Sequence, residues 1–170
     1  MDKEFFQRKV QSRLASFDHD KDGVITRADV DMVTGRALGA FGVAATSAQG
    51  KALSDAAGTF WSQVAADADG DRDGEIRQEE FFEAVACFQR AAQPWIRALV
   101  SAADRDGDGK LTAQEYRTVL QALGADKQAL RQLDQRPAAP IPVEAAQITA
   151  LEFFADHKPY SPATWSFGKF

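Results

Sequence analysis

The chain is poor in the residues that build disulfides and transition-metal sites. Its 170 residues include one cysteine, Cys87, and two histidines, His19 and His157. A single cysteine excludes an internal disulfide and suits a reducing compartment. Two histidines far apart in the sequence do not supply the ligands of a zinc or copper site. We therefore expect neither histidine to bind a metal, and we expect Cys87 to be packed or idle.

Long hydrophobic runs are missing as well. No stretch approaches the ~18 apolar residues of a membrane helix, and the N-terminal MDKEFFQRKVQSRL has no apolar signal core. Asp2 stands where N-myristoylation needs a glycine. By elimination we expect a cytoplasmic protein that does not contact membranes.

The patterns of common enzymes and of nucleic-acid binders do not stand out either. No Ser/His/Asp, Cys/His or glycine-rich phosphate-binding arrangement is recognisable, so we expect no enzyme. The net charge is −5, and the positive charges are scattered along the chain. A nucleic-acid partner is therefore not indicated.

What the sequence does contain is an acidic pattern of twelve residues that occurs three times. The segments are DHDKDGVITRAD (18–29), DGDRDGEIRQEE (69–80) and DRDGDGKLTAQE (104–115). Each has Asp at positions 1, 3 and 5, Gly at 6, Ile or Leu at 8 and a carboxylate at 12. This is the spacing of the EF-hand loop, which surrounds one Ca²⁺ with oxygen ligands. The pattern predicts three calcium sites, numbered I to III in chain order.

The loop positions also predict the ligands. Positions 1, 3, 5 and 12 supply carboxylates, position 7 supplies its backbone carbonyl, and position 9 often acts through a water. The predicted ligands of site I are Asp18, Asp20, Asp22, Val24, Thr26 and Asp29. Those of site II are Asp69, Asp71, Asp73, Glu75 and Glu80. Those of site III are Asp104, Asp106, Asp108, Lys110 and Glu115.

The three loops differ at two positions. Site III fits the pattern throughout, with Thr112 at position 9. Site II has Arg77 there, and arginine has only hydrogen-bond donors. Arg77 either turns to solvent or a neighbouring carboxylate while water fills the vertex, or its charge weakens the site. Site I ends in Asp29, one methylene shorter than glutamate, so we expect Mg²⁺ to compete with Ca²⁺ chiefly at this site.

Apolar residues at helical spacing flank every loop, as Leu14 and Phe17 do before the first. We therefore predict an all-α fold of four EF-hand units in two pairs, with short β-ladders between the paired loops. Pro94 is predicted at the first turn of a helix. The long interval at 42–55 is interpreted as a plain linker, or as helix extension plus a loop.

A degenerate fourth hand is predicted in the segment QITALEFF. Ile148 would occupy position 8 and Glu152 position 12, which places Ile141, Val143 and Ala145 at positions 1, 3 and 5. None of these three can offer a side-chain oxygen, so this hand would bind no metal. It would be kept because an unpaired hand leaves backbone groups and an apolar helix face without partners.

This organisation predicts two halves. Residues 1–90 would hold hands I and II, and residues 91–170 hands III and IV. An aromatic tail would follow and fold back on the core. Its aromatic residues are Tyr160, Trp165, Phe167 and Phe170.

The pattern resembles the sarcoplasmic calcium-binding proteins and their bacterial relative calerythrin. The resemblance rests on four hands, a long interval between loops I and II, Asp29 closing loop I, a degenerate hand and the tail KPYSPATWSFG. It implies a compact calcium buffer with its two halves packed together, although in calerythrin the degenerate hand is the second. We also expect a monomer, and the Ala-rich composition with more Arg than Lys suits a bacterial source. The alternative is a calcium sensor that regulates a protein partner. Sensors open a methionine-rich groove, whereas this chain has only Met1 and Met32.

Overall fold

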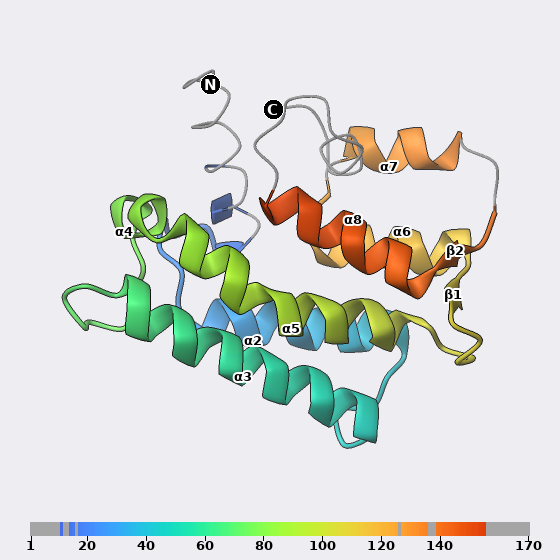
Figure 1. Ribbon diagram of the computed structural model, residues 1–170, viewed down its shortest axis with the longest axis horizontal. Helices are drawn as coiled ribbons and strands as arrows, with labels where there is room; N and C mark the ends of the chain where they lie inside the picture. Colours follow the sequence, from blue (N-terminus) through green and yellow to red (C-terminus); the bar gives the residue numbers. More distant parts are fainter. Residues whose placement is uncertain (1–10, 12–13, 16, 126, 136–138, 156–170) are drawn as a thin grey trace.

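The fold is all-α, as predicted, with short antiparallel pairing between loops (Figure 1). The computed structural model describes residues 11, 14–15, 17–125, 127–135 and 139–155. The elements are α2 (Arg27–Phe41), α3 (Ala48–Ala68), α4 (Gln78–Glu83), α5 (Val85–Ala103), β1 (Lys110–Leu111), α6 (Ala113–Ala122), α7 (Lys127–Asp134), β2 (Ile141–Pro142) and α8 (Val143–Ala155). The predicted aromatic tail lies outside the described residues. None of the described helices is long and apolar enough to cross a membrane.

Helix α5 lies in the middle of the molecule. It packs against α3 on one side and α8 on the other, and α2 lies behind α3 and α5 in Figure 1. Because α5 runs from hand II into hand III, and packs against α3 of hand II and α8 of hand IV, the two pairs of hands share one interface. The buried residues of both pairs form one hydrophobic cluster.

An aromatic stack at this interface joins three hands. Phe60 of α3 stacks on Trp95 of α5, with ring centroids 5.2 Å apart and planes 9° apart. Phe17, next to loop I, stacks on Phe60 at 5.6 Å, and Phe88 meets Phe60 edge-on. These four side chains are at most 4% exposed, so the apolar faces of hands I, II and III bury one another.

The interval between loops I and II is mostly helix. Gly42 ends α2 in the left-handed region, with φ of 68°, and Ser47 begins α3 by accepting a hydrogen bond from the Gly50 N–H. The helix that follows is 21 residues long. Of the two interpretations of this interval, helix extension plus a short turn is the one that the structure shows.

Pro94 does not begin a helix, so that prediction is wrong. Helix α5 starts at Val85 and Pro94 lies in its interior. Proline has no N–H to donate to the Arg90 carbonyl, four residues earlier. Both residues are exposed, so the missing bond lies on the outer side of the helix and the packed side remains continuous.

The predicted pairing of loops I and II is present. Ile25 and Ile76, at position 8 of their loops, exchange two backbone hydrogen bonds of 2.9 and 2.8 Å in an antiparallel bridge. Both side chains are 0% exposed. The bridge therefore satisfies the backbone groups and buries the β-branched side chains at once.

The pairing of hands III and IV exists in a different register from the predicted one. Leu111, at position 8 of loop III, lies opposite Ile141 and not opposite Ile148. Ile141 therefore holds position 8 of hand IV, while Ile148 lies within α8 and is 49% exposed. The prediction failed because Ile148, Glu152 and Phe153 have the spacing of a loop end, but a continuous helix supplies that spacing equally well.

Candidate metal centres

Each of the three loops turns in the same way. Their position-6 glycines, Gly23, Gly74 and Gly109, have φ of 93°, 85° and 80°, a conformation that glycine adopts without a steric cost. The N–H of each glycine donates to Oδ2 of the Asp at position 1 of its loop, at 3.1, 3.0 and 3.0 Å. This turn directs the acidic side chains towards one point.

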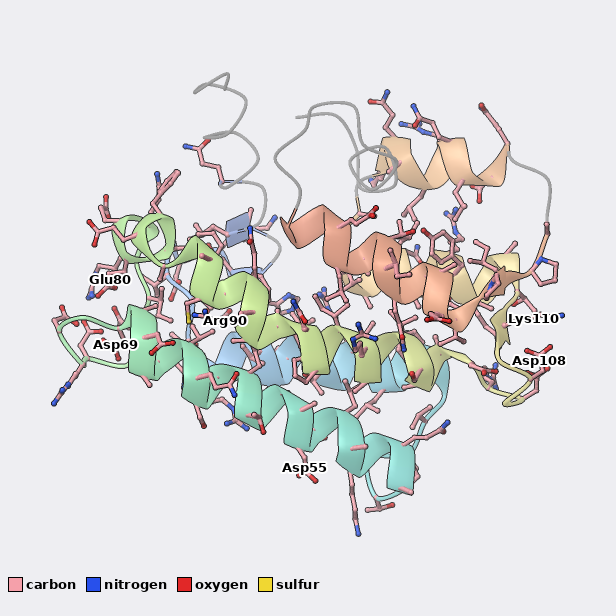
Figure 2. The ribbon with its side chains drawn as sticks, viewed as in Figure 1. Asp55, Asp69, Glu80, Arg90, Asp108 and Lys110 are labelled. Carbon is pink, nitrogen blue, oxygen red and sulfur yellow. The ribbon has the colours of Figure 1, made fainter. Side chains whose placement is uncertain are left out.

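The acidic side chains converge in all three loops. Three groups of carboxylates have oxygens that lie within 4.8 Å of one another, and they are Asp18–Asp20–Asp29, Asp69–Asp71–Asp73 and Asp104–Asp106–Asp108. Asp22, Glu80 and Glu115 lie outside these groups. Asp69 and Glu80 lie at one end of the molecule, and Asp108 and Lys110 at the other (Figure 2).

The donor set and one orphaned oxygen fit a hard cation such as Ca²⁺. The converging groups are all carboxylates, the ligands that calcium prefers. Asp18 is 8% exposed, and its Oδ1 is buried without a hydrogen-bond partner. A buried carboxylate oxygen without a partner is costly, and a cation among Asp18, Asp20 and Asp29 would satisfy it.

The carboxylate at position 12 closes each loop onto its own backbone. In loop II, Glu80 accepts the N–H of Gly70 at 2.9 Å and the N–H of Arg77 at 3.0 Å. Glu115 in loop III accepts from the equivalent positions. Asp29 does the same in loop I, from His19 at 2.9 Å and Thr26 at 2.8 Å. The shorter side chain of Asp29 therefore reaches the same donors, and it joins the converging group.

Hydrogen bonds lower the pKa of two closing carboxylates, Asp29 and Glu115. Burial alone would raise the pKa of Asp29, which is 1% exposed, but hydrogen bonds from Thr26 and His19 outweigh it and the pKa is lowered. For Glu115, burial also opposes ionisation, and the backbone and hydroxyl of Thr112 lower its pKa. A lowered pKa favours the charged form of both groups, which is the form that binds a cation.

In loop II, Arg77 turns to neighbouring carboxylates. Its Nη2 lies 2.7 Å from Asp73 Oδ2 and 2.9 Å from Glu75 Oε2, and its Nη1 lies 3.5 Å from Asp71 Oδ2. The hydrogen bond from Arg77 is the largest cause that lowers the pKa of Asp73. Of the predicted alternatives, the turn to carboxylates is the one observed, and two of these carboxylates are predicted ligands.

Hand IV keeps a carboxylate that the sequence analysis missed. Counting back from Ile141 places Asp134, the last residue of α7, at position 1. Arg117 of α6 pairs with Asp134 at 2.5 Å and donates to the Leu130 carbonyl at 3.2 Å. Positions 3 and 5 become Arg136 and Ala138, which have no side-chain oxygen. The signal that could have found this register is Asp134 seven residues before an Ile-Pro pair.

Cys87 lies beside loop II. Its Sγ is 3.0 Å from Asp67 Oδ2, and the two residues line an open surface pocket together with Gly70 and Glu80. Burial first, and then the hydrogen bond and charge of Asp67, raise the pKa of the Cys87 thiol to about 11. A thiol with so high a pKa is a poor nucleophile and a poor metal ligand at neutral pH.

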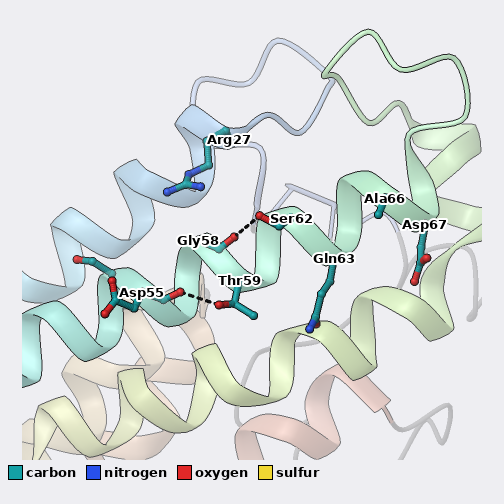
Figure 3. Close-up of a pocket in the computed structure, with 9 residues that line it drawn as sticks. Arg27, Asp55, Gly58, Thr59, Ser62, Gln63, Ala66 and Asp67 are labelled. Carbon is teal, nitrogen blue, oxygen red and sulfur yellow. Dashed lines mark hydrogen bonds between the residues drawn. The ribbon is translucent and has the colours of Figure 1, made fainter.

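A polar groove with a volume of about 720 Å³ lies along α3, and Arg27 of α2 is one of the residues that line it (Figure 3). Two of its hydroxyls are already used by the helix itself. Thr59 donates to the Asp55 carbonyl at 3.0 Å and Ser62 to the Gly58 carbonyl at 2.9 Å. These hydroxyls are therefore not available as donors to a ligand.

Comparisons with known proteins agree with this geometry. The sequence pattern of the EF hand family matches residues 96–120, which include loop III. Calerythrin from Saccharopolyspora erythraea is 27% identical over 139 residues, 74% of this chain and 78% of its own. A calcium-binding protein of Streptomyces coelicolor is 30% identical, covers 88% of this chain and 97% of its own, and superposes with a TM-score of 0.72.

A more distant match shows the same fold. The sarcoplasmic calcium-binding protein of amphioxus is 17% identical, covers 98% of each chain and superposes with a TM-score of 0.67. The sequence resemblance proposed from the loops is thereby confirmed. The chain belongs to the EF-hand calcium-binding proteins, a non-enzymatic family, is similar in sequence to calerythrin and shares the fold of the amphioxus sarcoplasmic calcium-binding protein.

Proposed function

We propose that the chain is a cytoplasmic calcium buffer that binds three Ca²⁺, one in each of loops I, II and III. The observation that carries the buffering role is the aromatic stack of Phe17, Phe60, Phe88 and Trp95. A sensor must open an apolar groove to a partner. Here the apolar faces of three hands are already occupied by one another.

The rest of the described surface supports the same role. Its exposed large hydrophobic residues are Met32 and Ile148, at 38% and 49%, which lie on α2 and α8. Single exposed apolar residues are ordinary on a protein surface. A flexible, methionine-lined docking surface of the kind that sensors use is not formed by these two side chains.

Within each site, the converging carboxylates would be joined by the position-7 carbonyls of Val24, Glu75 and Lys110. Calcium supplies charge neutralisation for the loop carboxylates, and the protein supplies the oxygen geometry. Site I, closed by Asp29, would tolerate Mg²⁺ better than the other two, since the smaller ion needs short bonds in octahedral geometry. We propose that the protein acts as a monomer.

The alternative function is a calcium sensor that acts on a protein partner. One observation favours it: the Streptomyces coelicolor protein, which is 30% identical, takes part in calcium-mediated regulation. A shared fold does not transfer that role by itself. The two functions differ in what calcium does to the apolar surface.

A dye that fluoresces on apolar surface separates the two functions. We would titrate the full-length protein with Ca²⁺ while following dye fluorescence and the radius of gyration. A buffer should lose dye binding and become more compact as the loops are neutralised. Increased dye fluorescence on a folded, calcium-loaded protein would establish the sensor instead. A triple variant, Asp18→Asn, Asp69→Asn and Asp104→Asn, is the control for effects of calcium outside the loops.

A further inference from the structure

We propose that Arg77 is a built-in competitor for calcium at site II. Its guanidinium holds the two carboxylate oxygens that an ion would need, so that site II is the weakest of the three sites and fills last. This inference rests on the proposed calcium binding by loops I to III and goes further, because it assigns an order of filling and the residue that sets it.

The first step concerns which oxygens are available to an ion. In loop II, Oδ1 of Asp71 accepts the Asp73 N–H at 3.3 Å, and Oδ1 of Asp73 accepts the Glu75 N–H at 2.9 Å. These bonds maintain the turn of the loop. Each side chain therefore has one oxygen, its Oδ2, that takes no part in these bonds of the loop turn.

Arg77 lies against these same two Oδ2 atoms. Its Nη2 is 2.7 Å from Asp73 Oδ2 and its Nη1 is 3.5 Å from Asp71 Oδ2. The planar guanidinium can bridge two carboxylates because its two terminal nitrogens are held in a fixed fork. A calcium ion must displace this fork before it can use both of these Oδ2 atoms.

Loops I and III provide the internal comparison. The equivalent Oδ1 atoms of Asp20, Asp22, Asp106 and Asp108 accept the same backbone N–H groups. Position 9 in these loops is Thr26 or Thr112, and each hydroxyl donates to the carboxylate at position 12. Within the described residues, no basic side chain pairs with the Oδ2 atoms of these four aspartates.

The ion pair should also help loop II to remain folded without calcium. Four carboxylates at positions 1, 3, 5 and 12 repel one another, and a guanidinium among them offsets part of that repulsion. Ile25 of loop I would then pair with Ile76 in a loop II that is already folded before any ion binds. Arg77 would thus preorganise loop II beside site I and would lower the calcium affinity of site II.

The test needs a separate readout for each site, and the position-6 glycines provide it. The amides of Gly23, Gly74 and Gly109 each donate to the position-1 carboxylate of their own loop. A cation on that carboxylate polarises the bond and shifts the amide resonance. A calcium titration of the ¹⁵N-labelled full-length protein, followed by NMR, therefore reports the three sites one by one.

In the wild type, the Gly74 resonance should respond at higher calcium than those of Gly23 and Gly109. Arg77→Thr, which installs the position-9 residue of the other loops, should shift the Gly74 midpoint to about three- to tenfold lower calcium. Arg77→Lys keeps the charge without the fork and should give an intermediate midpoint. Arg72→Asn is the matched control. Arg72 lies in the same loop with φ of 63° and has no ion pair among the described residues, so the change should be less than about twofold.

Two outcomes would overturn the inference. One is a Gly74 midpoint in the wild type that is equal to or below the other two, and the other is an unchanged midpoint in Arg77→Thr. A midpoint in Arg77→Lys equal to the wild type would overturn the role of the fork and leave charge as the cause. If none of the three glycines responds to calcium, it is the proposed calcium binding that fails, and the wild-type titration alone shows this.

Discussion

Leu111 of loop III lies opposite Ile141 in the antiparallel β1–β2 ladder. Leu111 is 0% exposed, and the Val143 N–H donates to the Gly109 carbonyl at 3.0 Å, so α8 begins directly from the ladder. This relationship fixes the register of hand IV. It places Asp134 at the first loop position, where Arg117 holds it in an ion pair. Hand IV therefore keeps the pairing surface of an EF-hand, while an arginine occupies the carboxylate that an ion would contact.

The register predicts a difference between two isoleucines of similar appearance in the sequence. Ile141→Ala should lower the free energy of unfolding by about 1–2 kcal/mol, because the side chain packs against the core. Ile148→Ala, at a position 49% exposed, should change it by less than about 0.5 kcal/mol. Urea unfolding at saturating calcium measures both. Equal costs, or a larger cost at Ile148, would contradict the observed register.

Two glycines of α3 should respond to alanine with opposite signs. A Cβ at Gly50 would lie 2.8 Å from Ala45 Cα and 2.9 Å from Ala45 O, both backbone atoms of the preceding turn. Gly50→Ala should therefore destabilise the protein by about 2 kcal/mol or more. A Cβ at Gly58 would meet only the end of Arg27 at 3.6 Å. Gly58→Ala should stabilise by up to about 1 kcal/mol through helix propensity, as thermal unfolding of the two variants would show.

Exchanging the closing residues of sites I and III should exchange their magnesium competition. Asp29→Glu should increase the preference of site I for Ca²⁺ over Mg²⁺, because the longer carboxylate reaches the larger ion with both oxygens. Glu115→Asp should reduce the preference of site III. The measurement is the calcium midpoint of Gly23 and Gly109 with and without millimolar Mg²⁺. If the competition at Gly23 is the same in Asp29→Glu as in the wild type, the assignment of Asp29 as the selectivity residue is wrong.

The Cys87 thiol should react slowly at ordinary pH. Its pKa is raised to about 11, so at pH 8 it carries roughly a hundredfold less thiolate than a cysteine in an unfolded chain. The alkylation rate of the folded protein should be lower by a similar factor and should rise with pH up to about 11. Asp67→Asn removes the neighbouring negative charge and should speed the reaction. A folded protein that reacts as fast as the unfolded chain would contradict the raised pKa.

Much of the site could be predicted from the sequence because loop chemistry is local. Twelve consecutive residues determine the turn at Gly23, Gly74 and Gly109, and the same residues carry the carboxylates that converge. The pairing of Ile25 with Ile76 was predictable for a related reason, since both occupy position 8 of their loops, where an unpaired loop would leave backbone groups without partners. The helices around the loops followed from apolar residues at helical spacing.

Other features could not be predicted because they depend on contacts between distant segments. The spacing of Ile148 and Glu152 is compatible with a loop end and with a helix, and only the contact with Leu111 decides between them. Pro94 could begin a helix or lie on the outer side of a longer one, and the packing of α5 against α3 and α8 decides this. The turn of Arg77 to carboxylates of its own loop is a local feature and was one of the predicted alternatives, so the structure adds only which oxygens it contacts.

The sequence by itself determined that this protein is an all-α EF-hand chain with three acidic loops and a fourth that has lost its ligands, because these properties depend on residue types at short, fixed spacings. Only the tertiary structure decided the register of hand IV and the aromatic stack that joins the hands. Both depend on contacts between side chains that are far apart in the sequence, and such contacts cannot be inferred from the spacing of residues within one segment.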